Sequence, residues 1–260
     1  MSLPHFFLDN QVIAHEALGA FALRLAPDDV KHARALRLSP GEHIAVVDAA
    51  KDYFECEVVA LDQDALSVRI AQKFDADRTL SAVVLVQGIA KGDKMDDIIR
   101  HATEIGVSGF VPFSCERSIV KLDEKKAAAR TQRWRSIAKS AAMQSGQRDV
   151  PEVSLPLSLG EVCDLVRNAH AVLVCWEEAS TGSIREALTG ALGAQGVLPE
   201  DARVVVVVGP EGGLTEHEAA RLTAANRFAS TVSLGPSILR TETAGLVAPA
   251  LVLYELGGLQ

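Results

Sequence analysis

The chain has few cysteines, four in 260 residues, and they are widely separated. Cys56, Cys115, Cys163 and Cys175 include no C-x-x-C pair, the spacing that zinc sites commonly show. This scatter argues against both a zinc site and a disulfide framework. We therefore expect no metal in the functional site, and we interpret the cysteines as small core or surface residues.

The sequence also lacks a long apolar run. No stretch approaches the ~20 residues that a membrane-spanning helix needs. Residues 1–10 lack the positively charged segment followed by an apolar stretch that marks a secretory signal. From these absences we expect a cytoplasmic protein with no membrane contact.

Positive charge is scarce overall. The chain has 26 Lys and Arg against 34 Asp and Glu, a net charge of -8, which is the wrong sign for an approach to phosphates. Residues 117–148 are an exception, with nine Lys or Arg and two acidic residues. Such a run is often a solvated helix face, but it also has the charge pattern of a nucleic-acid contact surface. Charge alone leaves both interpretations open.

The chain does contain two turns rich in glycine and proline in its C-terminal quarter. The first follows residues 204–208, five consecutive valines that are typical of a parallel strand covered on both faces. The segment GPEGG at residues 209–213 comes directly after, and ligands of open α/β sheets bind just beyond such strand ends. Its glycines permit positive φ and a close approach of backbone to a ligand. Thr215 and Glu218 have the capping-box spacing, so we expect a helix to begin there.

A second turn repeats this order. We predict a short strand over residues 231–234, a turn at Gly235 and Pro236, and a helix over about 240–256, where small and apolar residues recur with helical spacing. Either turn alone is a weak signal, but two such strand-to-helix turns together predict one ligand pocket. Neither matches the dinucleotide or phosphate-loop pattern, so neither NAD nor a nucleoside triphosphate is the expected ligand.

The remaining sequence divides into two regions. Short alternating runs at residues 43–47, 53–59 and 66–70 predict a small β-barrel domain over residues 1–74. We expect the charged residues 75–78 to form a linker. Over residues 80–260 strands and helices alternate, which predicts an α/β domain with a parallel sheet and helices on both faces. In that domain we expect strands at 82–89, 107–113 and 171–176, helices at 95–105 and 124–144, and a loop rich in Gly, Ala and Pro at 190–200.

Several separated blocks of the sequence resemble one known family. GPEGGLTEHE and LGPSILRTETA, at residues 209–218 and 234–244, are similar to the two cofactor motifs of the SPOUT-class methyltransferases. In this spelling they most resemble the bacterial 16S ribosomal RNA uridine-N3 methyltransferases, the RsmE family. Further segments of this chain resemble motifs of the family's catalytic domain. They are KGDKM at residues 91–95 with EIGV at 104–107, ERS at 116–118, WRSIA through QSG at 134–146, and PEV at 151–153. His32, LRL at 36–38 and PGE at 40–42 resemble the family's N-terminal domain.

This resemblance implies a SPOUT-type domain with a trefoil knot, a homodimer interface that completes the pocket, and an N-terminal PUA-like β-barrel that grips RNA. It implies S-adenosylmethionine as the cofactor and 16S ribosomal RNA, within the small ribosomal subunit, as the partner. The implied reaction is methyl transfer to N3 of a uridine. The residues implied for cofactor binding are Val208, Gly209, Pro210, Gly212, Gly213, Leu234, Gly235, Ile238, Leu239, Thr241 and Thr243.

Two residues of the second motif are the expected catalytic groups. Arg240 is the first choice for stabilising negative charge that develops on the uracil. Glu242, the one acidic residue of that motif, would orient the substrate or accept a proton, and it is equally suited to capping the first turn of the last helix. Thr241 and Thr243 also have a capping interpretation.

With the resemblance beside it, we interpret the basic run as an RNA surface. The residues expected to bind RNA are Arg34, Arg37, Arg117, Lys121, Arg130, Arg133, Gln144 and Arg148. After QSG the family usually has Arg, whereas here Gln147 precedes Arg148, and whether Arg148 replaces that Arg stays open. His5 stands where Arg is common and would contact a phosphate when protonated, although its ordinary pKa of ~6.5 leaves little charge at neutral pH.

Two other classes of function stay open. One is a SPOUT methyltransferase that acts on another RNA position, such as a ribose 2'-hydroxyl. The other is a catalytically silent RNA-binding assembly factor that keeps the pocket only as structure.

Overall fold

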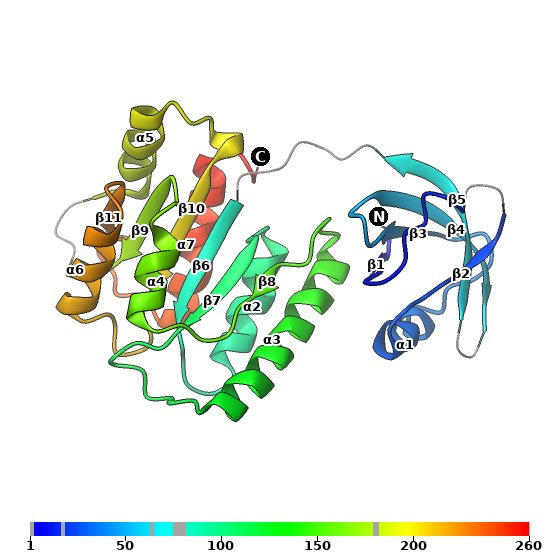
Figure 1. Ribbon diagram of the computed structural model, residues 1–260, viewed down its shortest axis with the longest axis horizontal. Helices are drawn as coiled ribbons and strands as arrows, with labels where there is room; N and C mark the ends of the chain where they lie inside the picture. Colours follow the sequence, from blue (N-terminus) through cyan, green and yellow to red (C-terminus); the bar gives the residue numbers. More distant parts are fainter. Residues whose placement is uncertain (1–2, 17–18, 63–64, 75–81, 179–181, 260) are drawn as a thin grey trace. The chain divides into compact units, whose positions relative to one another are not determined.

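The computed structural model describes residues 3–16, 19–62, 65–74, 82–178 and 182–259 (Figure 1). The chain divides into two compact units, of which the first contains residues 1–78 and 142–149 and the second residues 79–141 and 150–260. The linker predicted at residues 75–78 lies outside the described residues. Each unit has its own sheet.

The first unit is a small curled sheet of five strands with one helix (Figure 1). The predicted alternation is present in the fourth strand, where Phe54, Cys56 and Val58 are buried between partly exposed neighbours. Among the described strands, β1 pairs in parallel with β3 and the other pairs are antiparallel. In sheet order the strands are β1 (His5–Phe7), β3 (His43–Val47), β4 (Tyr53–Leu61), β5 (Leu66–Phe74) and β2 (Phe21–Leu23), and the helix is α1 (Pro27–Ala35).

The second unit contains a six-stranded parallel sheet. Its strands run in the order β11-β9-β10-β6-β7-β8, so β10 lies between β9 and β6 although β6 comes much earlier in the chain. The bounds in that order are Ala229–Val232, Ala171–Cys175, Arg203–Val208, Ala82–Gly88, Gly109–Phe113 and Glu152–Val153.

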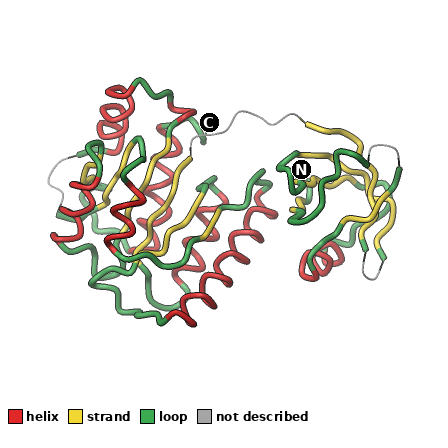
Figure 2. The backbone as a smooth tube through the Cα atoms, in the orientation of Figure 1, coloured by secondary structure: helices red, strands yellow, loops and turns green. Residues whose placement is uncertain are grey.

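Helices cover both faces of this sheet (Figure 2). The valines of β10 show why: Val204, Val206 and Val208 belong to one core cluster, and Val205 and Val207 to another. The first cluster includes residues of α2 (Lys94–Glu104), α3 (Glu124–Ser145), α5 (Ile184–Gln195) and α7 (Thr241–Glu255). The second includes residues of α4 (Leu159–Val166) and α6 (Glu216–Ala225). The predicted α/β class, with helices on both faces of a parallel sheet, is confirmed.

The loop predicted at residues 190–200 is wrong. Helix α5 extends to Gln195, and a short 3-10 helix covers Pro199–Asp201. The buried residues Ile184, Leu188, Ala191 and Leu192 have helical spacing, whereas Gly190 and Gly193 lie on the exposed face. The prediction was wrong because it relied on glycine content. Helix α5 tolerates these two glycines because they lie on its exposed face, away from the core.

Capping boxes mark the starts of α4, α5 and α6. The capping box predicted at Thr215 and Glu218 is present at the start of α6. The same box is formed by Ser158 and Glu161 at the start of α4 and by Ser183 and Glu186 at the start of α5. Neither of these two helices was predicted from its box. The strand predicted at 231–234 lies two residues earlier, at Ala229–Val232, because it pairs in register with β9.

Candidate functional site

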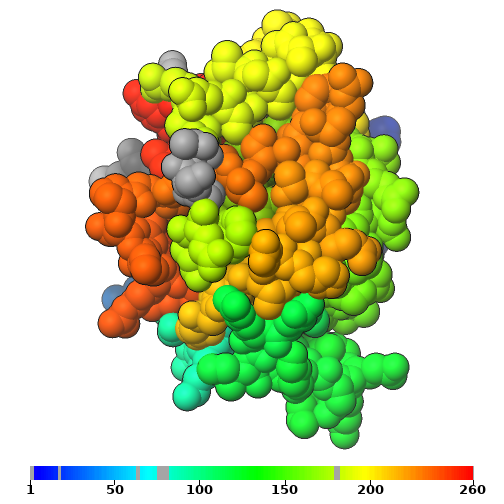
Figure 3. All heavy atoms as spheres, turned by 90° about the vertical axis from the view of Figure 1, so that its left-hand side faces the viewer, coloured from blue at the N-terminus to red at the C-terminus, as the bar shows by residue number. Residues whose placement is uncertain are grey.

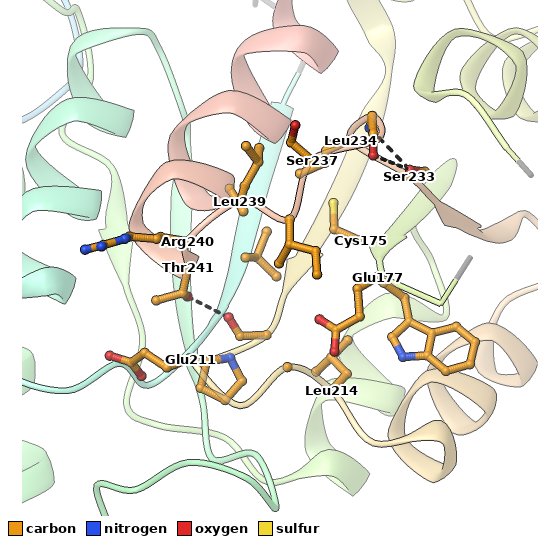
Figure 4. Close-up of a pocket in the computed structure, with 18 of the residues that line it drawn as sticks. Cys175, Glu177, Glu211, Leu214, Ser233, Leu234, Ser237, Leu239, Arg240 and Thr241 are labelled. Atoms are coloured by element: carbon orange, nitrogen blue, oxygen red, sulfur yellow. Dashed lines mark hydrogen bonds between the residues drawn. The ribbon is translucent and has the colours of Figure 1, made fainter. Parts of the chain in front are cut away.

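A pocket of about 410 Å³ lies at the carboxyl ends of β9, β10 and β11 (Figure 4). Ligands of open parallel sheets bind at such ends, and the volume is in the range of small-molecule sites. Both glycine-containing turns of the C-terminal quarter line this pocket, the first with residues 209–211 and 213–214 and the second with residues 233–239.

The first turn is packed too closely to accept side chains at its glycines. The Gly213 N–H donates to the Pro210 carbonyl at 2.9 Å, and the φ of Gly213 is +70°, a conformation that favours glycine. A Cβ on Gly213 would lie 2.8 Å from a carboxylate oxygen of Glu177. At the end of β6, a Cβ on Gly88 would overlap the Pro210 nitrogen. The turn is therefore seated directly on the sheet, with its backbone toward the pocket.

Gln87 is a buried polar residue that contacts the first turn and the start of α7. Its side-chain amide donates to the Gly88 carbonyl at 3.1 Å, to the Gly209 carbonyl at 3.3 Å and to Thr241 Oγ1 at 2.9 Å. The Thr241 hydroxyl donates in turn to the Gly209 carbonyl at 2.6 Å. This network attaches the first residue of α7 to the first turn. Gln87 was not among the predicted site residues, although a polar residue in the otherwise apolar strand β6 was an available signal.

Lys94 joins a carboxylate of the first turn to a carboxylate of α7. Its Nζ lies 3.1 Å from Oε1 of Glu211, in the glycine turn after β10. It also lies 3.0 Å from Oε2 of Glu242, the second residue of helix α7. The backbone N–H of Lys91 also donates to Glu211 Oε1 at 3.0 Å. The sequence motif at residues 91–95 drew attention to this segment, but it did not assign a role to Lys94 or to Glu211.

These contacts keep all three side chains charged at neutral pH. The pKa of Glu242 is lowered by its own backbone N–H at the start of α7, against the opposing effect of burial, and further by Lys94. Burial acts to raise the pKa of Glu211, but its own N–H, the Lys91 N–H and Lys94 outweigh it and lower that pKa. The pKa of Lys94 is raised by its hydrogen bonds to Glu242 and Glu211.

The second turn presents a cation and an apolar side chain at the pocket rim. Gly235 reverses the chain with a φ of +114°, and its N–H donates to Ser233 Oγ at 3.2 Å. Ile238 is 86% exposed. Arg240 is the N-cap residue of α7, and its side chain extends outward from the rim (Figure 4). This rim suits a planar, negatively charged group that approaches from outside the pocket.

The wall after β9 was not singled out by sequence analysis. Cys175, Trp176 and Glu177 line the pocket there, and the Glu177 carboxylate points into it (Figure 4). Burial raises the pKa of the Cys175 thiol to about 12. The thiol therefore stays protonated and is a poor nucleophile, and Glu177 is the charged group of this wall.

Most of the predicted cofactor residues line the pocket, but two do not. Gly212 faces the other way, toward Arg117, whose Cβ would lie 3.0 Å from a Cβ on Gly212. Thr243 is exposed in the first turn of α7. Arg240 lines the pocket, and Glu242 reaches the first turn through Lys94. The predicted residues that line the pocket are Val208, Gly209, Pro210, Gly213, Leu234, Gly235, Ile238, Leu239 and Thr241.

Two residues predicted to bind RNA hold backbone carbonyls instead of standing free. Arg117 donates to the Gly212 carbonyl at 3.1 Å and to the Leu214 carbonyl at 3.3 Å. Lys121 Nζ donates to the Cys115 carbonyl at 3.2 Å. Both residues therefore stabilise the loop that follows β7 and its contact with the first turn.

Arg133 likewise has a partner inside the second unit. Its guanidinium bonds Asp96 Oδ2 through two nitrogens, at 2.8 and 2.6 Å. The Asp96 side chain is only 8% exposed, whereas that of Arg133 is 65% exposed. Arg130 lies half-buried on the same helix, α3. Arg133 thus neutralises a buried carboxylate and still presents charge to solvent.

The other predicted RNA-binding residues belong to the first unit. Arg34, Arg37 and Gln144 are exposed. Arg148 places its guanidinium over the Tyr53 ring, 4.9 Å from the centroid. The segment after QSG therefore packs an arginine on the small sheet.

The expected contact of His5 with a phosphate is wrong, because His5 is only 5% exposed. Its Nδ1–H donates to the Leu3 carbonyl at 2.7 Å, and its Nε2 lies 3.2 Å from the Tyr53 hydroxyl. Burial lowers the pKa of His5, the Leu3 bond opposes that effect, and the charge of Arg148 lowers it further. His5 is therefore a neutral packing residue.

Within the described ranges, no cluster of three or more His, Cys, Asp or Glu is arranged to hold a metal ion. None of the helices in the same ranges combines the length and the apolar character that crossing a bilayer requires.

Comparison with known proteins connects this geometry to one family. Residues 77–253 match the family described as the RNA methyltransferase domain. The chain is 36% identical over 232 residues to the ribosomal RNA small subunit methyltransferase E of Bacillus subtilis, with 88% of each protein covered. It is 31% identical over 234 residues to the protein of the same name from Mycobacterium bovis, covering 88% of this chain and 85% of that relative.

A solved structure shows the same architecture. The ribosomal RNA small subunit methyltransferase E of Neisseria gonorrhoeae, crystallised with bound S-adenosyl methionine, is 28% identical and superposes with a TM-score of 0.78. The match covers 97% of both chains and so includes both units.

Proposed function

This chain belongs to the ribosomal RNA small subunit methyltransferase E family, and from that premise we propose that it methylates N3 of a specific uridine in 16S ribosomal RNA. The cofactor of the family is S-adenosylmethionine, which a relative binds. The observation that carries the proposal is the pocket, where two glycine-containing turns meet at the carboxyl ends of parallel strands.

The residues of the pocket fit S-adenosylmethionine. The glycine turn presents bare backbone, and a side chain on Gly213 would occupy space beside Glu177. Leu234 and Leu239 offer apolar contacts to an adenine ring, while Glu177 and Glu211 offer negative charge to a positively charged ligand. When bound there, the cofactor supplies a methyl group carried on a sulfonium cation.

Arg240 is the residue we assign to the substrate. The N3–H of uridine must be lost for the nitrogen to attack, so negative charge develops on the uracil. A guanidinium at the pocket rim can stabilise that charge, and such preorganised donors are often the largest single contribution to catalysis. Arg240 is exposed at this rim and sits at the start of α7, whose N-terminal dipole adds to the positive potential.

Glu242 is better suited to positioning than to accepting a proton. Its pKa is lowered by its backbone N–H and by Lys94, so it is a weak base at neutral pH. Together with Glu211, it holds Lys94 between the first turn and the start of α7. Proton acceptance by Glu242 stays a prediction, and a water or the bulk solvent is the alternative acceptor.

The partners and topology are part of the same proposal. We propose that the small sheet of the first unit is a PUA-like RNA-binding domain of residues 1–74, and that residues 80–260 form a knotted SPOUT domain that dimerises. The substrate is 16S ribosomal RNA within the small subunit, which places the activity in the cytoplasm. Arg34, Arg37, Arg130 and Arg148 are the basic residues we assign to RNA contact.

Methyl transfer from labelled S-adenosylmethionine tests this function. The purified chain is incubated with naked 16S ribosomal RNA and with isolated small subunits, and the modified nucleoside is identified by mass spectrometry. We expect 3-methyluridine at one position. A methyl group on a ribose 2'-hydroxyl would replace the N3 assignment, and a chain that binds RNA but no cofactor would be an assembly factor.

A further inference from the structure

Two neighbouring residues of the loop after β7, Glu116 and Arg117, hold the first turn to the start of α6. We call this pair the clasp. The Arg117 guanidinium donates to the carbonyls of Gly212 and Leu214. The Glu116 backbone N–H donates to Glu218 Oε1 at 2.8 Å. Figure 3 shows the green surface of this loop directly against the gold and orange surface of the turn and α6.

The carboxylate of Glu218 connects the clasp to the helix. Glu218 is 1% exposed and forms the capping box of α6 with Thr215. One oxygen accepts from the Thr215 N–H at 2.9 Å, and the other accepts from the Glu116 N–H. The Glu116 side chain also lies 3.0 Å from His217 Nδ1. The helix start and the loop after β7 are therefore one hydrogen-bonded unit.

Arg117 controls the orientation of the turn through a peptide plane. The carbonyl of Gly212 and the N–H of Gly213 belong to the same planar peptide group. When Arg117 holds that carbonyl, it also directs the Gly213 N–H to its acceptor, the Pro210 carbonyl. Gly212 lies so close to Arg117 that a Cβ there would be 3.3 Å from the Arg117 carbonyl oxygen. Gly213, which lies between the two residues whose carbonyls Arg117 holds, and Leu214, which is one of them, line the pocket.

We propose that Arg117 is a positioning residue for the cofactor turn, and that the clasp sets the affinity of the pocket for S-adenosylmethionine. This inference rests on the proposed function and competes with the expectation that Arg117 contacts an RNA phosphate. Holding a loop in its binding conformation raises affinity because less ordering remains to be done when the ligand binds. One guanidinium nitrogen, Nη1, donates to both carbonyls, and the rigid plane of the guanidinium fixes the directions of its N–H groups, which the rotating ammonium of a lysine does not.

Calorimetric titration with S-adenosylmethionine tests the proposal. Binding by the unaltered chain is measured first, since its absence would overturn the proposed function and this inference with it, whereas failure of the clasp alone would appear as binding that the variants leave unchanged. Arg117→Ala is expected to weaken binding at least tenfold and Arg117→Lys by a smaller factor. Gly212→Ala, which adds a methyl group against Arg117 but none to the pocket, is expected to weaken binding as well. Arg167→Ala is the matched control, because it removes an exposed arginine that pairs with Asp164 on α4.

Steady-state kinetics separate positioning from RNA contact. If Arg117 positions the turn, Arg117→Ala raises KM for S-adenosylmethionine and leaves KM for ribosomal RNA within twofold of the unaltered value. A rise in KM for RNA with unchanged cofactor affinity would overturn the proposal and restore the phosphate contact. Cofactor affinity within twofold of the unaltered chain in both Arg117→Ala and Gly212→Ala would also overturn it. If Arg117→Ala does not fold, Arg117→Lys and Gly212→Ala decide by the same criteria.

Discussion

The Lys94 Nζ lies 3.0 Å from Glu242 Oε2, and this ion pair joins the first residue of α2 to the first turn of α7. Because Lys94 also pairs with Glu211, it connects the first glycine-containing turn to the start of α7. The charge states of these three groups therefore depend on one another.

Replacing Lys94 by Met should raise the pKa of both carboxylates. Each loses its cationic partner, while the Lys91 N–H still holds Glu211. A carboxyl group with a lowered pKa contributes stability above its unfolded pKa and loses it as pH falls through the folded pKa. The variant should accordingly lose less stability on acidification. Carbon-13 NMR titration of the Glu carboxyls measures the shift, with Lys91→Met as the control that keeps the backbone bond. Unchanged titration of Glu242 would contradict the ion pair.

Gly213→Ala should weaken S-adenosylmethionine binding by at least ~10-fold, equivalent to ~1.4 kcal/mol. The added Cβ would meet the Glu177 carboxylate, and the φ of +70° disfavours any side chain. Calorimetry provides the measurement. Gly190→Ala is the matched control, because Gly190 lies on the exposed face of α5 with nothing within 4 Å of a Cβ. Equal affinity in a folded Gly213→Ala variant would place the cofactor elsewhere.

Arg240→Ala should slow single-turnover methyl transfer by ~10²-fold or more, the effect typical of losing one donor to a developing negative charge. Cofactor affinity should change far less, because an interaction made mainly in the transition state contributes little to ground-state binding. Arg240→Lys should rescue poorly, since lysine lacks the planar fork of donors. Rapid-quench kinetics with saturating RNA give the rate. A normal rate in Arg240→Ala would refute the assignment.

Lys125, an exposed residue of the basic run at 117–148, lies with Arg130 on helix α3, and Lys125→Gln and Arg130→Gln should flatten the salt dependence of RNA binding. Each phosphate contact that is lost lowers the slope of log affinity against log salt by up to ~0.9, if the RNA behaves like a duplex. Filter binding over a range of salt concentrations measures the slope, and the affinity for S-adenosylmethionine should stay the same. If the slope does not change, these residues form a solvated helix face.

Arg133→Gln should lower the thermal midpoint of unfolding, unlike Lys125→Gln. The Asp96 carboxylate is nearly buried, and it would lose the guanidinium that neutralises it. A buried charge without its partner is strongly destabilising. Differential scanning calorimetry compares the two variants, and Asp96→Asn combined with Arg133→Gln should recover part of the loss. Equal midpoints for Arg133→Gln and Lys125→Gln would contradict this account.

The class of the second unit and the turns of its pocket were predictable from the sequence because their signals are local. Five consecutive valines at 204–208 indicate a strand covered on both faces, and that strand ends at a glycine turn. Thr215 and Glu218 stand three residues apart, the spacing of a capping box, so the start of α6 could be located without any tertiary contact. Where composition was weighed above spacing, as at residues 190–200, the prediction was wrong.

The partners of the site residues were decided only by the tertiary structure. The order β9-β10-β6 in the sheet places Gln87 beside Gly209 and Thr241, and no local pattern specifies which strands become neighbours. The same holds for Lys94 with Glu242 and for Arg117 with Gly212. A basic residue has the same local appearance whether it binds a phosphate, a carboxylate or a carbonyl. Its role depends on which group the folded chain brings within hydrogen-bonding distance.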